Sequence, residues 1–324
     1  MSRYVIKRLV TSLIILWAVL TATFLLVHLA PGDPSMLYIR PEIDAKVVAN
    51  IRSQMGFDMP VWKQYFIWIK NFIQGDFGFS FVQHQSVSRI LVDAIPNTLR
   101  LTVSVLVFQY FVGILLGIVC ALKQKSKLDT IINGGLLFLY AMPGFWIALI
   151  AILVFSLYLG WLPSSQMNSI QEFNSTWAYL WDSFRHLILP TLILSIPFVS
   201  YTTRFVRDKF IGILKDSYII TAKAFGLKKN LILFKYALKN ALLPLITLVG
   251  LYLPFLLGGA VITEFVFAWP GMGRITVNAI YTHDYPLILA TNFIATFAVI
   301  GGNFVSDILY YVADPRIRFG KNIS

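Results

Sequence analysis

The side chains that could carry out chemistry are few and far apart in this sequence. The single cysteine excludes an intrachain disulfide and a cysteine-based metal cluster. The four histidines form no HxH or HxxxH pair, and the sequence contains no GxxxxGK[ST] nucleotide loop, no GxSxG elbow and no HExxH zinc motif. We therefore expect no enzymatic site in this chain and no metal or cofactor bound by it. These scattered residues are Cys120, His28, His84, His186 and His283.

The composition indicates that most of the chain is solvated by lipid. Hydrophobic residues make up 57% and charged residues 13% of the 324 residues, against roughly 45–50% and about 25% in ordinary soluble domains. The mean hydropathy of +0.72 agrees. A soluble protein of this length could not cover its surface with so few charges, so the sequence predicts an all-α membrane protein.

Six apolar stretches are long enough, or nearly so, to cross a bilayer core, which takes roughly 20 helical residues. The first follows a basic start like that of a signal peptide, but its apolar run is too long for one and no cleavage site follows, so we expect it to be retained. The long uncharged run from residue 130 becomes polar and helix-breaking at Trp161, so we count one span there. The expected spans are 9–30, 101–122, 130–158, 186–203, 240–262 and 286–308.

The net charge of +12 has two possible meanings, since it could indicate a nucleic-acid partner or the cytoplasmic bias of Lys and Arg in membrane proteins. With six spans and both termini in the cytoplasm, the charge divides into +13 inside and −1 outside. A seventh span would place the nine cations of loop 204–239 outside. The excess of positive charge therefore reflects the orientation of the chain in the membrane. We expect membrane lipid but no nucleic acid as a partner.

The extracytoplasmic segment 31–97 is too long to be a plain connector. Its aromatic run from Trp62 to Ile73 predicts a helix that ends at Gly75-Asp76-Phe77-Gly78. The apolar residues cover more than one helical face, and aromatic residues favour the membrane–water boundary. Two interpretations stay open: a helix lying on the outer membrane surface, or a helix packed under the spans as ordinary core.

The cytoplasmic loop 204–239 carries two apolar and basic helical stretches that meet at Gly226. A solvated face would not leave so many apolar residues in water, so such a ridge either lies on the membrane or inserts into a groove of a partner. Gly226 suits a helix end and a turn with positive φ. The simpler alternative is a positively charged cytoplasmic loop without a partner.

The segment 218–227, followed 17 residues after Gly226 by Leu243-Pro244, resembles the EAA loop of ABC importer permeases. The surrounding sequence is similar to the dipeptide/oligopeptide/nickel permease family, and within it to the first of two permease subunits. The similarity extends nearly from end to end. Its other motifs are Arg3-Tyr4, Pro31-Gly32-Asp33-Pro34, Gly75-Asp76-Phe77-Gly78, Pro143, Thr263-Glu264, Trp269-Pro270-Gly271-Met272-Gly273-Arg274, Asp284-Tyr285-Pro286 and Asp314-Pro315-Arg316.

The resemblance implies a type I importer permease with six transmembrane helices, in the bacterial cytoplasmic membrane. Members pair two homologous permease chains with two ATPase subunits, which hold ATP and magnesium, and with an extracytoplasmic binding protein that delivers peptide or, in some members, nickel or a metal chelate. By resemblance, the ATPase-coupling residues are Tyr218, Thr221, Ala222, Lys223, Ala224, Gly226, Leu227, Leu243 and Pro244. The residues expected on the binding-protein or gate side are Asp76, Gly78, Glu264, Trp269, Pro270, Gly271, Gly273 and Asp284.

The chain departs from the family pattern where the motif's glutamate would be, because Ile220 stands there, and Thr221 replaces an alanine. We therefore expect apolar contact and no ion pair at Ile220. The alternatives from other classes are a stand-alone secondary transporter or channel and a structural membrane protein. The scarcity of intramembrane charges and the missing inverted repeat argue against the first, and the organised cytoplasmic loop argues against the second.

Overall fold

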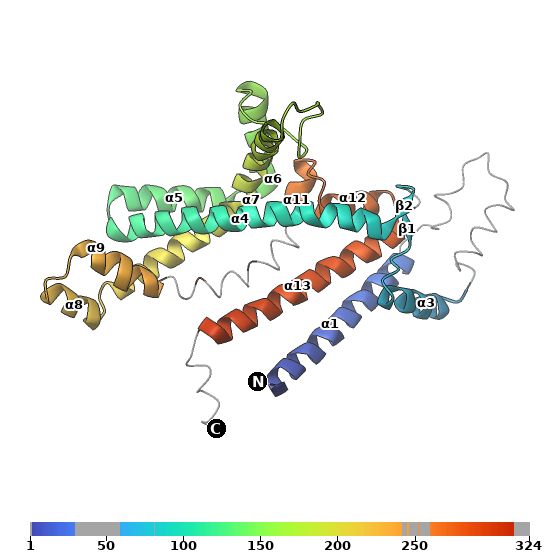
Figure 1. The fold of residues 1–324 in the computed structure, drawn as a ribbon, viewed down its shortest axis with the longest axis horizontal. Helices are drawn as coiled ribbons and strands as arrows, with labels where there is room; N and C mark the ends of the chain where they lie inside the picture. The colour runs from blue at the N-terminus through green and yellow to red at the C-terminus, as the bar shows by residue number, and fades with distance from the viewer. Residues whose placement is uncertain are drawn as a thin grey trace. The chain divides into compact units, whose positions relative to one another are not determined.

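Helices account for nearly all the secondary structure in the part of the chain that the structure describes (Figure 1). The structure is a computed structural model that describes residues 2–29, 59–80, 82–241, 245, 252 and 260–313. The chain divides into two compact units. The first contains residues 1–97 and 271–300, and the second contains residues 98–270 and 301–324.

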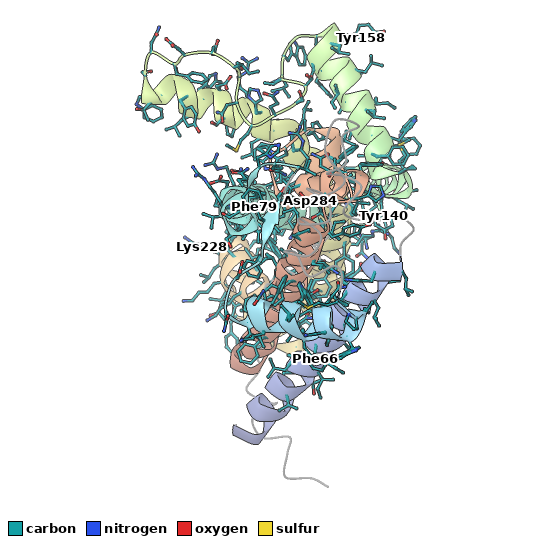
Figure 2. The ribbon with its side chains drawn as sticks, turned by 90° about the vertical axis from the view of Figure 1, so that its right-hand side faces the viewer. Phe66, Phe79, Tyr140, Tyr158, Lys228 and Asp284 are labelled. Atoms are coloured by element: carbon teal, nitrogen blue, oxygen red, sulfur yellow. The ribbon has the colours of Figure 1, made fainter. Side chains whose placement is uncertain are left out.

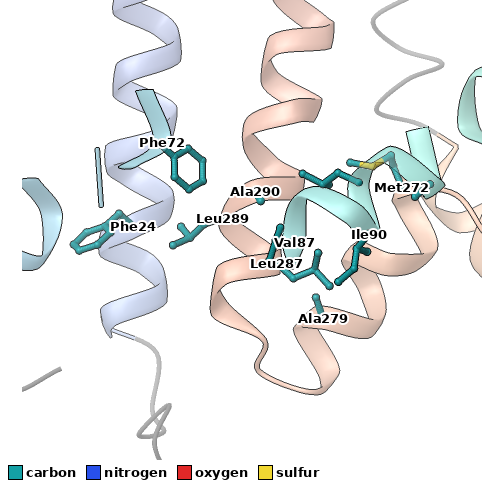
Figure 3. Packing of buried hydrophobic residues seen from close by; sticks show 11 residues of the cluster. Phe24, Phe72, Val87, Ile90, Met272, Ala279, Leu287, Leu289 and Ala290 are labelled. Atoms are coloured by element: carbon teal, nitrogen blue, oxygen red, sulfur yellow. The ribbon is translucent and has the colours of Figure 1, made fainter. Parts of the chain in front are cut away.

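The first unit is built around one apolar cluster, seen from close by in Figure 3. Its helices are α1 (Ser2–Leu29), α3 (Val61–Ile73), the start of α4 (Val87–Leu122), α12 (Met272–Tyr281) and most of α13 (Tyr285–Ala313). A two-residue antiparallel hairpin, β1 (Phe79–Ser80) with β2 (Gln85–Ser86), precedes α4, with Ser80 opposite Gln85. The buried side chains of the cluster include Phe24, Phe72, Val87, Ile90, Met272, Ala279, Leu287 and Ala290.

Helix α3 is the helix expected from the aromatic run, and its two faces differ. Phe72 is buried against Phe293 of α13, with ring centroids 5.5 Å apart. On the other face, Trp62 and Phe66 are each 65% exposed; Phe66 is labelled in Figure 2. One face thus packs as core, while the other presents the aromatic surface that an interfacial helix requires. Its placement on the membrane stays a prediction.

The second unit contains the rest of α4 and two further groups of helices. The first group is α5 (Lys127–Ala141), α6 (Gly144–Ala151), the π-helix η2 (Ile152–Tyr158) and α7 (Thr176–Ile213). The second is α8 (Ser217–Ala224), α9 (Lys229–Leu231), the π-helix η3 (Ile232–Leu238) and α11 (Val261–Val266). Three buried apolar clusters lie within this unit.

Three of the described helices, α4, α7 and α13, are long and apolar enough to cross a membrane. A shorter apolar helical stretch, Val10–Leu26, lies in α1. Helix α4 begins 14 residues before the expected span at 101, because charges at Arg89, Asp93 and Arg100 interrupt the apolar count without interrupting the helix. Most of the expected span 240–262 lies outside the described residues, so the six-span count stays a prediction.

The stretch expected to form one span at 130–158 is broken in the structure. Helix α5 ends at Ala141, α6 begins at Gly144, and the two are bent by 103°. Met142 takes an extended backbone (φ −83°, ψ 144°) because the residue before a proline is driven out of the helical region. Proline and glycine at 143–144 therefore divide the stretch, which is either a broken span or a re-entrant loop.

Helices α4 and α7 approach each other closely through two glycines. A Cβ atom on Gly113 would lie 2.8 Å from Cβ of Thr202, and one on Gly117 would lie 2.7 Å from Cβ of Val206. Both pairs have the same sequence offset, so the two helices run in the same direction along this contact. Small residues at such an interface let two backbones come together, as is common between membrane helices.

Candidate coupling site and outer segments

The short helix α8 forms directly after α7, where Asp216 starts a new turn. The Asp216 carbonyl accepts hydrogen bonds from the backbone N–H groups of Ile219 (3.0 Å) and Ile220 (3.1 Å). Asp216 itself has an extended backbone (φ −65°, ψ 146°), which separates α8 from the end of α7. The change of direction thus occurs at one residue and leaves α8 as a separate element of eight residues.

Gly226 terminates α8 with positive φ, which confirms the helix end expected there. Its φ is +74°, its N–H donates to the Lys223 carbonyl at 3.0 Å, and the Leu227 N–H donates to the Ala222 carbonyl at 3.2 Å. These two bonds make the Schellman pattern, which satisfies the last carbonyls of a helix. A side chain at Gly226 would be strained in this conformation.

One face of α8 is fixed by an apolar cluster of the same loop. Ile219 is 0% and Ala222 is 8% exposed, and both pack with Phe210 of α7 and with Ile232 and Ala237 of η3. The Tyr218 hydroxyl also accepts a hydrogen bond from the Asn240 side chain at 3.0 Å. Helix α8 and η3 contact each other at the end of α7 (Figure 1). Buried contacts therefore hold α8 in place.

Three large apolar side chains of α8 and of the turn after it are exposed, Tyr218, Ile220 and Phe225, and we call this set the ridge. Their exposed fractions are 39%, 56% and 82%. Tyr218 and Ile220 lie about 100° to either side of the buried Ile219. The same loop carries exposed lysines, and in the described part of the chain none of them pairs with a carboxylate. These lysines are Lys215, Lys223, Lys228, Lys229, Lys235 and Lys239. Lys228 is labelled in Figure 2.

An open hollow of about 370 Å³ lies beside α8. Its apolar lining comes from the ends of α4 and α7 and from the segment that follows Gly226. Lys223 and Lys229 also line this hollow. The hollow therefore combines apolar and cationic side chains, as the ridge and the exposed lysines of the loop do. The lining residues are Leu122, Leu214, Lys223, Leu227, Lys229, Ile232 and Leu233.

An ion pair ties the cytoplasmic turn before α5 to the end of α7. Arg207 donates to both carboxylate oxygens of Asp129, at 2.8 Å from Nε and 2.7 Å from Nη2. The Asp129 side chain is 6% exposed. Both residues lie outside the apolar stretches 130–158 and 186–203, and the Arg207 hydrogen bonds hold the pKa of Asp129 below its ordinary value. The ion pair thereby joins the start of loop 204–239 to the cytoplasmic turn before α5.

In the first unit, the structure brings together three of the residues expected on the outer side. Asp76 accepts a hydrogen bond from the Gly78 N–H at 2.9 Å, and a Cβ on Gly78 would lie 3.6 Å from Cβ of Pro286. Ser80 donates to Asp284, which is 4% exposed (Figure 2). Burial raises the pKa of Asp284 above its ordinary value. These residues hold the hairpin against the start of α13.

The remaining outer residues are also mostly buried. In the second unit, Glu264 and Trp269 are both 0% exposed, the Trp269 N–H donates to the Glu264 carbonyl at 2.8 Å, and Thr98 donates to the Glu264 carboxylate at 2.7 Å. Pro270 follows and is partly buried. In the first unit, the buried residues Gly271 and Gly273 stand at the start of α12. Glu264 and Trp269 thus shape their loop from inside and do not face outward.

The residues that the structure describes contain no group of three or more His, Cys, Asp and Glu side chains that could hold a metal ion. Cys120 is buried. The Nε2 atom of His28 lies 3.1 Å from the Gln64 side chain, and Nδ1 of His186 lies 2.8 Å from the Asp182 carbonyl. These two histidines have structural partners within the chain.

Comparison with known proteins now adds to this geometry. Residues 113–319 match the family described as binding-protein-dependent transport system inner membrane component, and residues 1–102 match the N-terminal part of such a membrane component. The chain belongs to this permease family. It is therefore a multi-pass inner-membrane component of an ABC importer.

Two relatives are similar along their entire length. The oligopeptide transport system permease protein AppB of Bacillus subtilis is 37% identical over 321 residues, covering 98% of this chain and all of the relative. The glutathione transport system permease protein GsiC of Escherichia coli K12 is 36% identical over 323 residues, again covering 98% and 100%. A crystal form of the inward-facing MetNI methionine ABC transporter shares the fold, with a TM-score of 0.56 and 17% identity over 69% of this chain and 96% of the other.

The coupling residues expected for the permease separate into two groups. Tyr218, Thr221, Lys223, Ala224, Gly226 and Leu227 are exposed on or after α8, whereas Ala222 is buried beneath it. Leu243 and Pro244 lie outside the described residues. Apolar contact was expected at Ile220, whereas Phe225 was not among the expected coupling residues. The signal available for Phe225 was a large apolar side chain in a loop otherwise rich in lysine.

Proposed function

We propose that this permease forms half of the translocation path of an ATP-driven importer of di- or oligopeptides, with α8 as the element that contacts the ATPase. Both full-length relatives carry names of peptide systems, one for oligopeptides and one for glutathione, which is itself a small peptide. That agreement supports peptide over nickel or a metal chelate as the substrate.

The proposed assembly contains a second, homologous permease chain, two ATPase subunits and an extracytoplasmic binding protein. In this proposal ATP and magnesium are bound by the ATPases, and this chain holds no cofactor. The binding protein docks on the outer segments 31–97 and 264–286. Buried residues such as Asp284 and Glu264 give these segments a fixed shape. The contact with the binding protein is then made by exposed residues beside them.

The observation that carries the proposal is the set of exposed apolar side chains, the ridge, on a helix that buried contacts hold in place. An apolar surface in water is unfavourable unless a partner covers it. The ridge and its lysines fit a groove with an apolar floor and acidic edges. Ile219 and Ala222 anchor α8 to α7 and η3. When the ATPase displaces α8, the end of α7 is therefore displaced as well.

The ridge can be tested in the reconstituted complex with the variant Phe225→Ser. Removing an exposed aromatic anchor from a docking surface costs about 2 kcal/mol, or roughly 30-fold in affinity. We expect loss of ATPase co-purification and of peptide uptake into proteoliposomes, together with loss of the rise in ATP hydrolysis on adding the peptide-loaded binding protein.

Phe234→Ser is the matched control, since Phe234 is 64% exposed in the same loop but lies on η3, on the way to the expected span at 240. It should retain ATPase binding. Equal losses in both variants, or full coupling in Phe225→Ser, would contradict the assignment of the ridge. Uptake of nickel but not of peptide by the unmodified complex would overturn the proposed substrate.

A further inference from the structure

A buried amide without a partner lies in the middle of α4. Gln109 is 0% exposed, and neither its side-chain nitrogen nor its oxygen has a hydrogen-bond partner among the residues that the structure describes. It lies within the apolar stretch 101–122, where no water from the lipid side can compensate. Burying an unpaired amide is unfavourable, so the group needs an explanation.

The face of α7 opposite this part of α4 carries further buried polar groups. Gly113 lies one turn after Gln109 on the same side of α4, and it contacts Thr202 of α7. The hydroxyls of Thr202 and Thr203 are both buried; Thr202 interacts with Tyr252, and Thr203 has no hydrogen-bond partner in the described part of the chain. The helices run in the same direction, so Gln109 lies at the level of Phe198, one turn before Thr202.

Three tyrosines extend this group toward the surface of the chain. The Tyr252 ring contacts Phe198 at 5.1 Å, Tyr201 at 6.1 Å and Tyr110 at 6.4 Å between centroids. Tyr201 is 50% exposed, whereas Tyr110 and Tyr252 are partly buried. We call Gln109, Tyr110, Tyr201, Thr202 and Tyr252 the polar cluster. It reaches from the buried α4–α7 contact to an exposed edge.

Helix packing alone does not account for the polar cluster. Polar residues stabilise membrane helix pairs when they hydrogen-bond across the interface, and the Gln109 amide makes no such bond within the described residues. The cluster has no charged member, so it does not suit an ion or a charged headgroup. Amide and hydroxyl groups next to aromatic rings suit a neutral ligand with its own amide groups and apolar side chains, which describes a peptide backbone.

We propose that the polar cluster lines the translocation path of this permease and hydrogen-bonds the amide groups of the passing peptide. The proposal rests on the peptide-import function above and names residues on the path. In this structure Gln109 is buried. A shift of α4 relative to α7 makes the amide accessible to water and substrate.

Substituted-cysteine labelling tests this placement in the complete importer. Cys120 is the sequence's one cysteine, so Cys120→Ser provides a cysteine-free chain. Gln109→Cys and Val107→Cys are then introduced separately, and a membrane-impermeant thiol reagent is applied to proteoliposomes with and without ATP plus vanadate. Val107 is the matched control, because it is 66% exposed on the opposite side of α4.

We expect Gln109→Cys to be labelled in one nucleotide state and protected in the other, with Val107→Cys unlabelled in both. No labelling at residue 109 in either state, or equal labelling at both residues, would overturn the proposal. ATPase coupling and peptide uptake of the unmodified complex are measured in parallel, and their failure would instead count against the proposed function.

A second variant gives a readout that does not depend on labelling. Gln109→Leu keeps the volume and removes the amide, so it should lower the amount of peptide taken up per ATP hydrolysed. A purely structural role predicts unchanged uptake per ATP, or an increase in stability, because an unpaired buried amide has been removed. That result would contradict a contact between Gln109 and the peptide.

Discussion

At the scale of single residues, Arg207 shows how the second unit uses charge. Its guanidinium binds two carboxylates, the buried Asp129 and the exposed Asp208, whose side chain is 72% exposed. The two contacts have nearly equal lengths, 2.7 and 2.9 Å, but burial makes them different. Exposed ion pairs contribute little because water screens them, whereas a buried charge that loses its partner is costly.

This difference predicts unequal effects of two similar substitutions. Asp129→Asn should lower the stability of the purified complex by about 2 kcal/mol, less than a fully buried pair would give because Arg207 keeps some contact with solvent. Asp208→Asn should change it by less than about 0.5 kcal/mol. Thermal unfolding in detergent measures both, and equal shifts would show that burial of Asp129 has no energetic role.

Residues also show what a single sequence can and cannot reveal about the candidate site. Gly226 was predictable, because glycine between two apolar and basic stretches indicates a helix end on local chemistry alone. The burial of Ala222 was not, since a helix of eight residues is too short for its periodicity to identify the packed face. Gln109 carries no charge, so its residue type gave no reason to predict a site there. Its burial where α4 meets α7 becomes apparent only in the three-dimensional structure.

At the scale of elements, the glycines of α4 fix how α4 and α7 pack together. A Cβ on Gly117 would lie 2.8 Å from the Thr203 carbonyl oxygen and 2.7 Å from Cβ of Val206. The first of these is a backbone atom, which cannot turn away as the end of a flexible side chain could. Adding a methyl group therefore forces the two helices apart over the turns that also contain Gln109 and Thr202.

Gly117→Ala should consequently destabilise the complex by about 1–3 kcal/mol, the usual cost of overpacking a tight contact. Gly134→Ala on α5 is the matched control, because a Cβ there meets no atom within 4 Å. The control should be neutral or stabilising by up to about 1 kcal/mol, since alanine favours the helix. A stability gain in both variants would contradict a close α4–α7 contact.

The elements were predictable to different degrees. Counting uncharged residues located the middle of α4, α7 and α13, because lipid-facing segments must lack charge. It did not locate their ends, because a helix can continue past the apolar stretch through charged residues, as α4 does at Arg89 and Asp93. The break at Pro143-Gly144 could not be predicted from the proline alone, because proline also occurs within unbroken helices, as Pro190 and Pro197 do in α7.

At the scale of the whole molecule, the bend between α5 and α6 makes the topology testable. If the bent pair crosses the membrane, segment 159–175 lies outside and the cationic loop 204–239 lies in the cytoplasm. If the pair is re-entrant, both placements reverse. The positive-inside rule favours the crossing, because it keeps nine Lys and Arg residues on the cytoplasmic side.

Reporter fusions distinguish these two arrangements. We expect a reporter active only outside the cytoplasm to function when inserted near Asn174 and to be silent in the turn at residues 123–126 and at the C-terminus. A reporter active only in the cytoplasm should give the reverse pattern. Cytoplasmic activity at Asn174 would identify α5 and α6 as re-entrant and would overturn the six-span topology.

The ion pair between Asp129 and Arg207 also has a consequence for synthesis. The two residues are 78 positions apart in the chain, so at about 5–20 residues per second Asp129 leaves the ribosome roughly 4–16 s before its partner. During that interval α5, α6 and most of α7 are synthesised. The ion pair can therefore form only when most of α7 has been made, just before α8 emerges.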